Sequence, residues 1–362
     1  MSLRDLIAVF DALDAERISP DISMPAALPL ELSGETVRPR LCIFPGPAGA
    51  EYALRADFTL PVAQIEAERR QPGAAETRTY AYDGPVFRLP SRPGEAVEFR
   101  QLGFEQYGQT DRRAADKLAL ETLLGAVQAA RIEGLTVRTG DLALMPALID
   151  ALGLVPEVAN ALKRAFRQPG GMTALLNRNE DTAGRLAERL AALPEADARS
   201  LIEETMAVAG ISSIGTRGMD EVVERLIMQG RGAVASRMSD AEKKLLQDFA
   251  AINVPAAAAA DTLSRFLAGN GLELDADLLE QLAARQSNIP ANLAATFTPI
   301  YGRQFTYYDG FVFDIFKAES CLGGGGRYDS LLSHLTDGQS DAVAVGGALR
   351  MDRVMIAIGD EQ

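Results

Sequence analysis

Length, composition and charge set the first limits on what this protein does. The chain has 362 residues, 47% hydrophobic and 24% charged, as in soluble globular proteins of one large domain with an insertion or of two domains. The formal net charge of −14, with no run of Lys or Arg, argues against a nucleic-acid partner, because binding phosphate backbones requires a basic surface. A small molecule or another protein is the expected partner.

Few residues are available for metal or disulfide chemistry. Cys42, Cys321 and His334 are the only cysteines and histidine, so we expect no metal and no cofactor, and we place His334 on a solvated helix. The N-terminal segment 1–18 has charges between its apolar residues, as in an amphipathic helix and not a signal peptide. No apolar run approaches the ~20 residues that span a bilayer. We therefore expect a cytoplasmic protein without membrane contact.

The expected elements fall into three regions along the chain. Residues 1–125 combine one helix with short strands and turns rich in Pro and Gly, and residues 126–290 are almost entirely helical after a short strand near 135–140. Residues 297–360 return to strands and glycine-rich segments. Strands flanking a block of helices favour an α+β fold with an antiparallel sheet over a doubly wound sheet.

Two sites in the helical region have sequence signals for the start of a helix. Ser239 and Glu242 have the spacing of a capping box, and Asp275 and Asp277 stand where the start of a helix favours acids. The region contains no fixed-period repeat. We expect a core formed by both ends of the chain and a mostly helical insertion, with boundaries at 1–155 and 290–362 for the core and 156–289 for the insertion.

The segment EFRQLGFEQYG (98–108) has the alternation of a half-buried strand. Gln101 and Glu105 then point the same way, ~14 Å apart along the backbone at ~3.4 Å per residue, with Gly103 between them. That gap suits a small polar ligand above Gly103. A surface strand with ordinary polar alternation explains the same pattern.

Other motifs also allow two interpretations. In LRADFT (54–59), Asp57 and Thr59 can hold an ammonium group, or Thr59 can cap a helix whose first turn contains Pro61. Arg88 can bind a carboxylate or phosphate, or lie free on the surface. The glycine-rich segment LGGGGR (322–327) can bind an anion, although a tight turn explains it as well, and Tyr307 and Tyr308 in the strand-like run 305–316 can belong to the core or face a ligand.

Taken in order, LRADFT, GPVFR, FRQLGFEQYG, YYDGFVF, GGGGRYDSLL and AVGGALRMDR resemble the catalytic core of histidyl-tRNA synthetases, which have a class II synthetase fold. The resemblance covers about residues 1–355, and the helical middle matches poorly. It implies a histidine site in which Asp57 and Thr59 hold the α-amino group and Arg88 meets the carboxylate side. The further residues implied are Gln101 and Glu105 lining the pocket, Arg303 near the amino acid, and Tyr307 and Tyr308 near the imidazole.

Several departures from the synthetase pattern affect the ATP and tRNA portions. Arg88 is followed by Leu89-Pro90 where synthetases have an acid that helps hold ATP, and the next loop is acidic instead of basic. Arg350 stands where synthetases have a glycine, three residues before Arg353. The chain ends nine residues after Arg353, before any anticodon-binding domain. Phe58 and Thr306 also depart from the pattern and leave the imidazole contacts open.

This combination resembles the family of ATP phosphoribosyltransferase regulatory subunits, which are paralogues of the synthetases. The resemblance implies a non-catalytic protein without catalytic residues, which activates a short-form catalytic ATP phosphoribosyltransferase and senses L-histidine for feedback inhibition in the first step of histidine biosynthesis. It also implies a homodimer within a larger hetero-oligomer. An enzyme that activates histidine or another amino acid as its adenylate is the alternative, since Arg353 and the glycines are kept. An RNA-binding pseudosynthetase is a third, which the charge of −14 disfavours.

Overall fold

The computed structural model of the chain describes most of its residues, and it divides them into two compact units. The described residues are 2–33, 35–91, 94–167, 172, 204, 238–302 and 307–359. One unit consists of Met1–Leu144 and Ala250–Gln362, and the other of Met145–Phe249. Helices α12 (Ala259–Gly269) and α13 (Ala276–Ser287), which lie in the stretch expected as the insertion, belong to the first unit.

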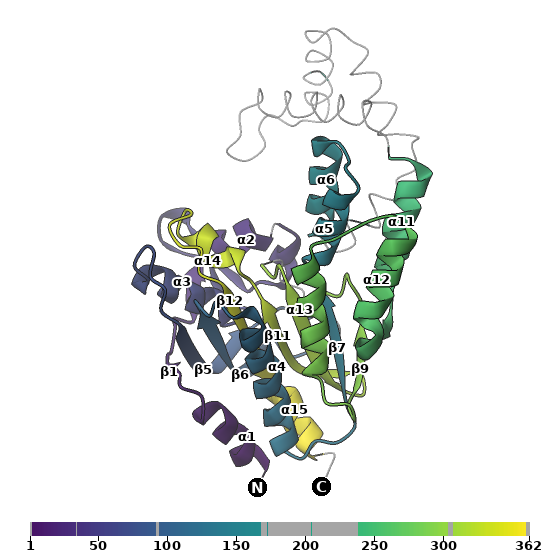
Figure 1. The fold of residues 1–362 in the computed structure, drawn as a ribbon. Helices are drawn as coiled ribbons and strands as arrows, with labels where there is room; N and C mark the ends of the chain where they lie inside the picture. The colour runs from purple at the N-terminus through teal and green to yellow at the C-terminus, as the bar shows by residue number, and fades with distance from the viewer. Residues whose placement is uncertain are drawn as a thin grey trace. The chain divides into compact units, whose positions relative to one another are not determined.

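A nine-stranded sheet forms the centre of the first unit (Figure 1). Its order is β1-β5-β6-β12-β11-β10-β7-β9-β8. The six strands from β5 to β7 pair antiparallel with one another, as expected for an α+β fold, whereas β1 is parallel to β5 and β9 is parallel to β7. The strands are β1 (Glu16–Arg17), β5 (Arg78–Phe87), β6 (Glu98–Tyr107), β7 (Leu135–Asp141), β8 (Val254–Pro255), β9 (Ala294–Phe297), β10 (Phe311–Lys317), β11 (Ser320–Arg327) and β12 (Ala344–Arg350). A small separate sheet has the order β2 (Ser23–Pro25), β4 (Glu51–Leu54), β3 (Ile43–Pro45).

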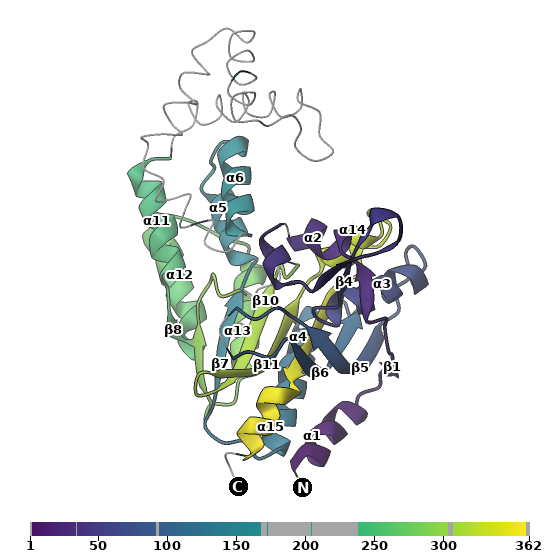
Figure 2. The ribbon, with the colours of Figure 1, turned by 180° about the vertical axis from the view of Figure 1, so that it is seen from behind.

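One face of the large sheet is covered by α1 (Ser2–Asp11), α4 (Arg112–Ala129) and α15 (Met351–Gly359), with α13 beside α4 (Figures 1 and 2). Leu6 and Phe10 of α1, at helical spacing, are buried with Leu123 of α4 against Leu102 and Phe104 of β6. The amphipathic N-terminal helix expected from sequence is therefore confirmed. Its apolar stripe forms this part of the core.

The opposite face of the sheet is covered by α3 (Thr59–Arg69) and α14 (Ser330–Leu335), with the short α2 (Ala27–Ser33) and the small sheet nearby (Figure 2). Val62 and Leu332 pack there with Tyr80, Tyr82 and Val312 of the sheet in a second apolar cluster. This cluster surrounds the candidate site described below.

Strand β6 is confirmed, although it is not half-buried. All residues from Gln101 to Tyr107 are buried, because helices cover both faces of the sheet at this point.

The glycine-rich segment forms strand β11, so the tight turn suggested by sequence is wrong. A Cβ atom on Gly325 would lie 2.1 Å from the carbonyl oxygen of Gly346, and one on Gly323 would lie 2.5 Å from that of Ala348. Glycine is therefore required by the close approach of β11 and β12.

Start signals of the helical region are confirmed where the structure describes them. Ser239 donates its backbone N–H to Glu242 Oε2 at 2.6 Å and receives that of Glu242 on its own Oγ at 3.2 Å, which caps α11 (Asp240–Ala250). Asp275 caps α13 by accepting the N–H of Asp277 at 2.9 Å. The other described helices of this stretch are α5 (Leu144–Ala151) and α6 (Pro156–Phe166). No helix in the described ranges is long and apolar enough to cross a membrane.

The glycine strand allows a direct test of the packing. We expect Gly325→Ala to lower the free energy of unfolding by about 1–3 kcal/mol or more, because the added methyl group meets backbone that cannot move aside. Gly125→Ala, inside α4 and with nothing within 4 Å of the added atom, should raise it by about 0.5–1 kcal/mol. Urea unfolding of both variants measures the difference. A Gly325→Ala variant as stable as the wild type would contradict the packing.

Candidate functional site

Six of the eight residues expected to bind a ligand are buried on the α3 side of the sheet: Asp57, Thr59, Gln101, Glu105, Tyr307 and Tyr308. Two direct contacts join them, since Thr59 Oγ1 donates to Glu105 Oε1 at 2.8 Å and the Tyr307 hydroxyl donates to Asp57 Oδ2 at 2.8 Å. Arg88 lies at the adjoining end of β5, where its Nε donates to the carbonyl oxygen of Ala56 at 2.6 Å. Arg303 and Thr306 lie outside the described residues.

Glu105 is at the centre of the site and is only 1% exposed. Its carboxyl group accepts hydrogen bonds from Thr59, from the Tyr82 hydroxyl at 2.9 Å and from the Tyr328 hydroxyl. A glycine on the next strand makes room for it, because a Cβ on Gly346 would lie 1.7 Å from Glu105 Oε2. Three neutral hydroxyls thus surround a carboxyl group that is shielded from bulk solvent.

This environment changes the ionisation of the site. Burial raises the pKa of Glu105 from 4.5 to about 7, and the charge of Asp57 adds to the rise, while the hydrogen bonds from Tyr328, Thr59 and Tyr82 oppose it. Burial also raises the pKa of the Tyr82, Tyr307 and Tyr328 hydroxyls well above the usual range, so these remain protonated donors. Glu105 is consequently the group that titrates near neutral pH.

Asp57 is placed by the start of α3. Its Oδ1 accepts the backbone N–H of Leu60 at 3.4 Å, and Phe58, not Thr59, occupies the N-cap position. Thr59 is the first helical residue, so its expected role as N-cap is wrong, and its hydroxyl is directed to Glu105 instead. Neither Asp57 nor Glu105 has a cationic partner among the residues that the structure describes.

The space expected above Gly103 contains a side chain. The Tyr82 hydroxyl lies 2.7 Å from where a Gly103 Cβ would be, so a ligand at that place requires Tyr82 to shift. Gln101, on the same strand face, is 6% exposed, and its Oε1 accepts no hydrogen bond from any described residue. A buried amide oxygen without a donor costs free energy, so a ligand that donates to Gln101 Oε1 would remove that cost.

A group of arginines adjoins the site near Phe99. The guanidinium of Arg350 lies 3.7 Å from the centre of the Phe99 ring, and that of Arg88 lies 5.3 Å from it. Arg353 is 3.7 Å from Glu95, a carboxylate of the acidic loop that precedes β6. The Phe99 ring is thus in contact with Arg350, and Arg353 is in contact with Glu95.

Sequence reasoning did not identify Tyr82 and Tyr328 as members of the site. Tyr82 pairs with Gly103 in the register of β5 and β6, and Tyr328 directly follows the glycine-rich strand. With Tyr80, Tyr107, Tyr307 and Tyr308 they make six of the eight tyrosines of the chain part of one buried cluster. Among the described residues, no group of three or more His, Cys, Asp or Glu could hold a metal ion.

Comparisons with known proteins agree with this fold. The family model for histidyl-tRNA synthetase matches residues 29–217 and 228–354. The solved structure of an ATP phosphoribosyltransferase regulatory subunit/histidyl-tRNA synthetase from Bacillus halodurans superposes with a TM-score of 0.60 at 19% identity, covering 98% of this chain and 77% of that one. A histidine–tRNA ligase subunit from Alicyclobacillus acidocaldarius gives a TM-score of 0.56 at 21% identity, with 99% and 92% covered. The fold is that of the class II synthetases.

Curated proteins with similar sequences indicate a particular branch of this family. The ATP phosphoribosyltransferase regulatory subunits of Brucella anthropi and Agrobacterium fabrum are each 32% identical to this chain, over 99% of its length and 97% of theirs. That of a Chelativorans species is 33% identical over 96% and 95%. The chain belongs to the histidyl-tRNA synthetase family, in the branch of the ATP phosphoribosyltransferase regulatory subunits.

The burial of Glu105 predicts a pH dependence of stability. Between its unfolded pKa near 4.5 and its folded pKa of about 7, the folded state holds the proton more tightly, so the group costs stability as the pH rises through that window. Relative to Glu105→Gln, which cannot ionise, the wild type should lose up to about 3 kcal/mol between pH 5 and pH 8. Urea unfolding of both proteins at the two pH values checks this. A difference independent of pH would show that Glu105 ionises normally.

Proposed function

We propose that this protein is a non-catalytic regulatory subunit of ATP phosphoribosyltransferase that binds L-histidine and transmits feedback inhibition in the first step of histidine biosynthesis. The observation that carries the proposal is the pair of buried carboxyl groups, Asp57 and Glu105, whose described partners are hydroxyls and a backbone N–H and include no cation. An uncompensated buried carboxylate is costly, so the site favours a ligand that brings positive charge and N–H donors.

Histidine has the matching groups. Its α-ammonium can pair with Asp57 and with the hydroxyl of Thr59, its imidazole N–H can donate to Glu105, and Gln101 Oε1 can accept a further donor. Tyr307 and Tyr308, with ring centres 4.7 Å apart, offer apolar surface to the imidazole. Arg88 and Arg303 are the residues proposed for the carboxylate side.

The regulated partner is proposed from the relatives. Proteins named ATP phosphoribosyltransferase regulatory subunit imply a catalytic subunit, here a short-form ATP phosphoribosyltransferase, and we propose a homodimer within a larger hetero-oligomer. Feedback requires two states of the complex with different affinity for histidine. A coupling free energy of about 1–3 kcal/mol is the usual scale.

The arginines near Phe99 support a role without catalysis. Arg350 covers a face of the Phe99 ring, Pro90 replaces an acid, and Glu95 approaches Arg353. In the resemblance to synthetases these positions belong to the ATP seat, where in this chain Arg350 contacts Phe99 and Arg353 contacts Glu95. The alternative, an enzyme that forms an amino-acyl adenylate, needs that seat open.

Histidine binding should depend on the two carboxyl groups. We expect Glu105→Gln and Asp57→Asn each to weaken binding by about 1–3 kcal/mol, the cost of a lost charge-assisted hydrogen bond. Asp83→Asn is the matched control, because Asp83 is an exposed residue of β5 that pairs with Arg100 at 2.6 Å. Calorimetry measures the affinities, and tyrosine fluorescence offers a second signal because the chain has no tryptophan. Unchanged affinity in both site variants would contradict the assignment.

The regulatory role predicts two further results. Co-purification with a short-form ATP phosphoribosyltransferase should give a complex whose activity is raised by this protein and lowered by histidine, and Glu105→Gln should keep the activation while responding only to higher histidine concentrations. Histidine-dependent ATP–pyrophosphate exchange by this protein alone should be absent. Clear exchange would favour the adenylating enzyme, and salt-sensitive binding of tRNA would favour the RNA-binding alternative.

A further inference from the structure

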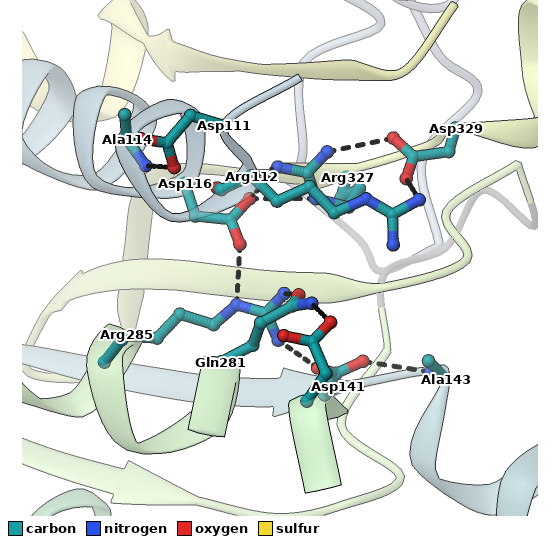
Figure 3. Close-up of polar contacts among 12 residues, drawn as sticks. Asp111, Arg112, Ala114, Asp116, Asp141, Ala143, Gln281, Arg285, Arg327 and Asp329 are labelled. Atoms are coloured by element: carbon teal, nitrogen blue, oxygen red, sulfur yellow. Dashed lines mark hydrogen bonds and ion pairs between the residues drawn. The ribbon is translucent and has the colours of Figure 1, made fainter. Parts of the chain in front are cut away.

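A buried chain of ion pairs connects Arg327, the last residue of β11, with helices α4 and α13 (Figure 3). Asp116 of α4 accepts hydrogen bonds from Arg327 Nη2 at 2.5 Å on Oδ1 and from Arg285 Nε at 2.6 Å on Oδ2. Arg285, on α13, also pairs with Asp141 at the end of β7. All four side chains are at most 4% exposed, so each charge depends on its partners.

The segment that includes Tyr328 is fixed on both sides by this chain. Arg327 Nη1 lies 3.0 Å from Asp329 Oδ1, and Asp329 Oδ2 lies 3.0 Å from Arg112 of α4. Asp329 Oδ1 also accepts the backbone N–H of Ala344 at 2.9 Å. Tyr328 stands between two residues whose side chains are held by ion pairs.

The Tyr328 side chain belongs to the hydrogen-bond network around Glu105. Its hydroxyl donates to Glu105, and its ring packs edge-on against Tyr107, Tyr307 and Tyr308. Asp116 holds the guanidinium of Arg327. The backbone at 327 and 328 is also held by main-chain hydrogen bonds, since Tyr328 donates its N–H to the carbonyl oxygen of Ala344 at 2.9 Å. Two networks that share no side chain are thus joined through one peptide unit.

We propose that Asp116 is a positioning residue for the histidine site: through Arg327 it holds Tyr328 where the tyrosine hydroxyl meets Glu105. The inference rests on the proposed function and deepens it. Asp141 is the natural comparison, because it pairs with Arg285 and, among the described contacts, does not touch Arg327.

The test compares Asp116→Asn with Asp141→Asn. Both variants leave a buried guanidinium with less counter-charge and should lose stability in urea unfolding. Only Asp116→Asn should weaken histidine binding in calorimetry, by about tenfold or more, as for the loss of one hydrogen bond to a charged group. Equal effects of the two variants on the dissociation constant would reduce Asp116 to a purely structural role.

A double-mutant cycle with Tyr328→Phe tests whether Asp116 affects histidine binding through the Tyr328 hydroxyl. If Asp116 acts through the Tyr328 hydroxyl, Asp116→Asn should add no further loss of affinity when Tyr328→Phe is present. An undiminished loss in that background would overturn the proposal. Should Asp116→Asn fail to fold, Arg327→Lys replaces it, since lysine keeps the charge but cannot reproduce the two contacts of the guanidinium with Asp116.

The near-ultraviolet circular dichroism of the tyrosines separates this inference from the proposed function. In the protein without ligand, Asp116→Asn should change the tyrosine band, Asp141→Asn should leave it unchanged, and Tyr328→Phe should remove the effect of Asp116→Asn. If the wild type binds no histidine, the proposed function fails while this signal still reports the positioning. If histidine binds and Asp116→Asn has the same tyrosine band as the wild type, the positioning fails alone.

Discussion

A carboxyl group buried in the sheet and surrounded by hydroxyls is the constraint on which the site depends. Removing Glu105 from water is costly, and the donors from Thr59, Tyr82 and Tyr328 offset only part of that cost. The residues around it follow from this need. Glycine at 346 gives the carboxyl group space, α3 brings the threonine, β5 brings Tyr82, and the turn after β11 brings Tyr328. The group is held in place but its charge is left uncompensated.

The contrast with the ion pairs around Asp116 is informative. There, each buried carboxylate meets a guanidinium, and the charges join α4, α13, β7 and β11 into one unit. On the α3 side of the same sheet, two carboxyl groups meet only neutral donors among the described residues. Paired charges of the first kind organise the fold, whereas carboxyl groups of the second kind remain available for a cationic ligand.

Sequence reasoning recovered those features that depend on local patterns. The amphipathic first helix, the capping box at Ser239 and strand β6 follow from spacing along the chain, and the order of short motifs indicated the synthetase fold. It missed the strand conformation of the glycine-rich segment, because only the neighbouring backbone of β12 shows why a side chain is excluded there. It also missed Tyr82 and Tyr328, whose roles arise from strand register and from a turn, neither of which a one-dimensional pattern encodes.

The glycine at position 346 has a consequence for how this protein can diverge. Because no side chain fits at position 346 of β12 opposite Glu105, substitution there cannot reshape ligand recognition. New ligand preferences must arise from other residues around the carboxyl group, such as those at the start of α3 and the buried tyrosines. Paralogues that accept different molecules on this scaffold should therefore differ at those residues.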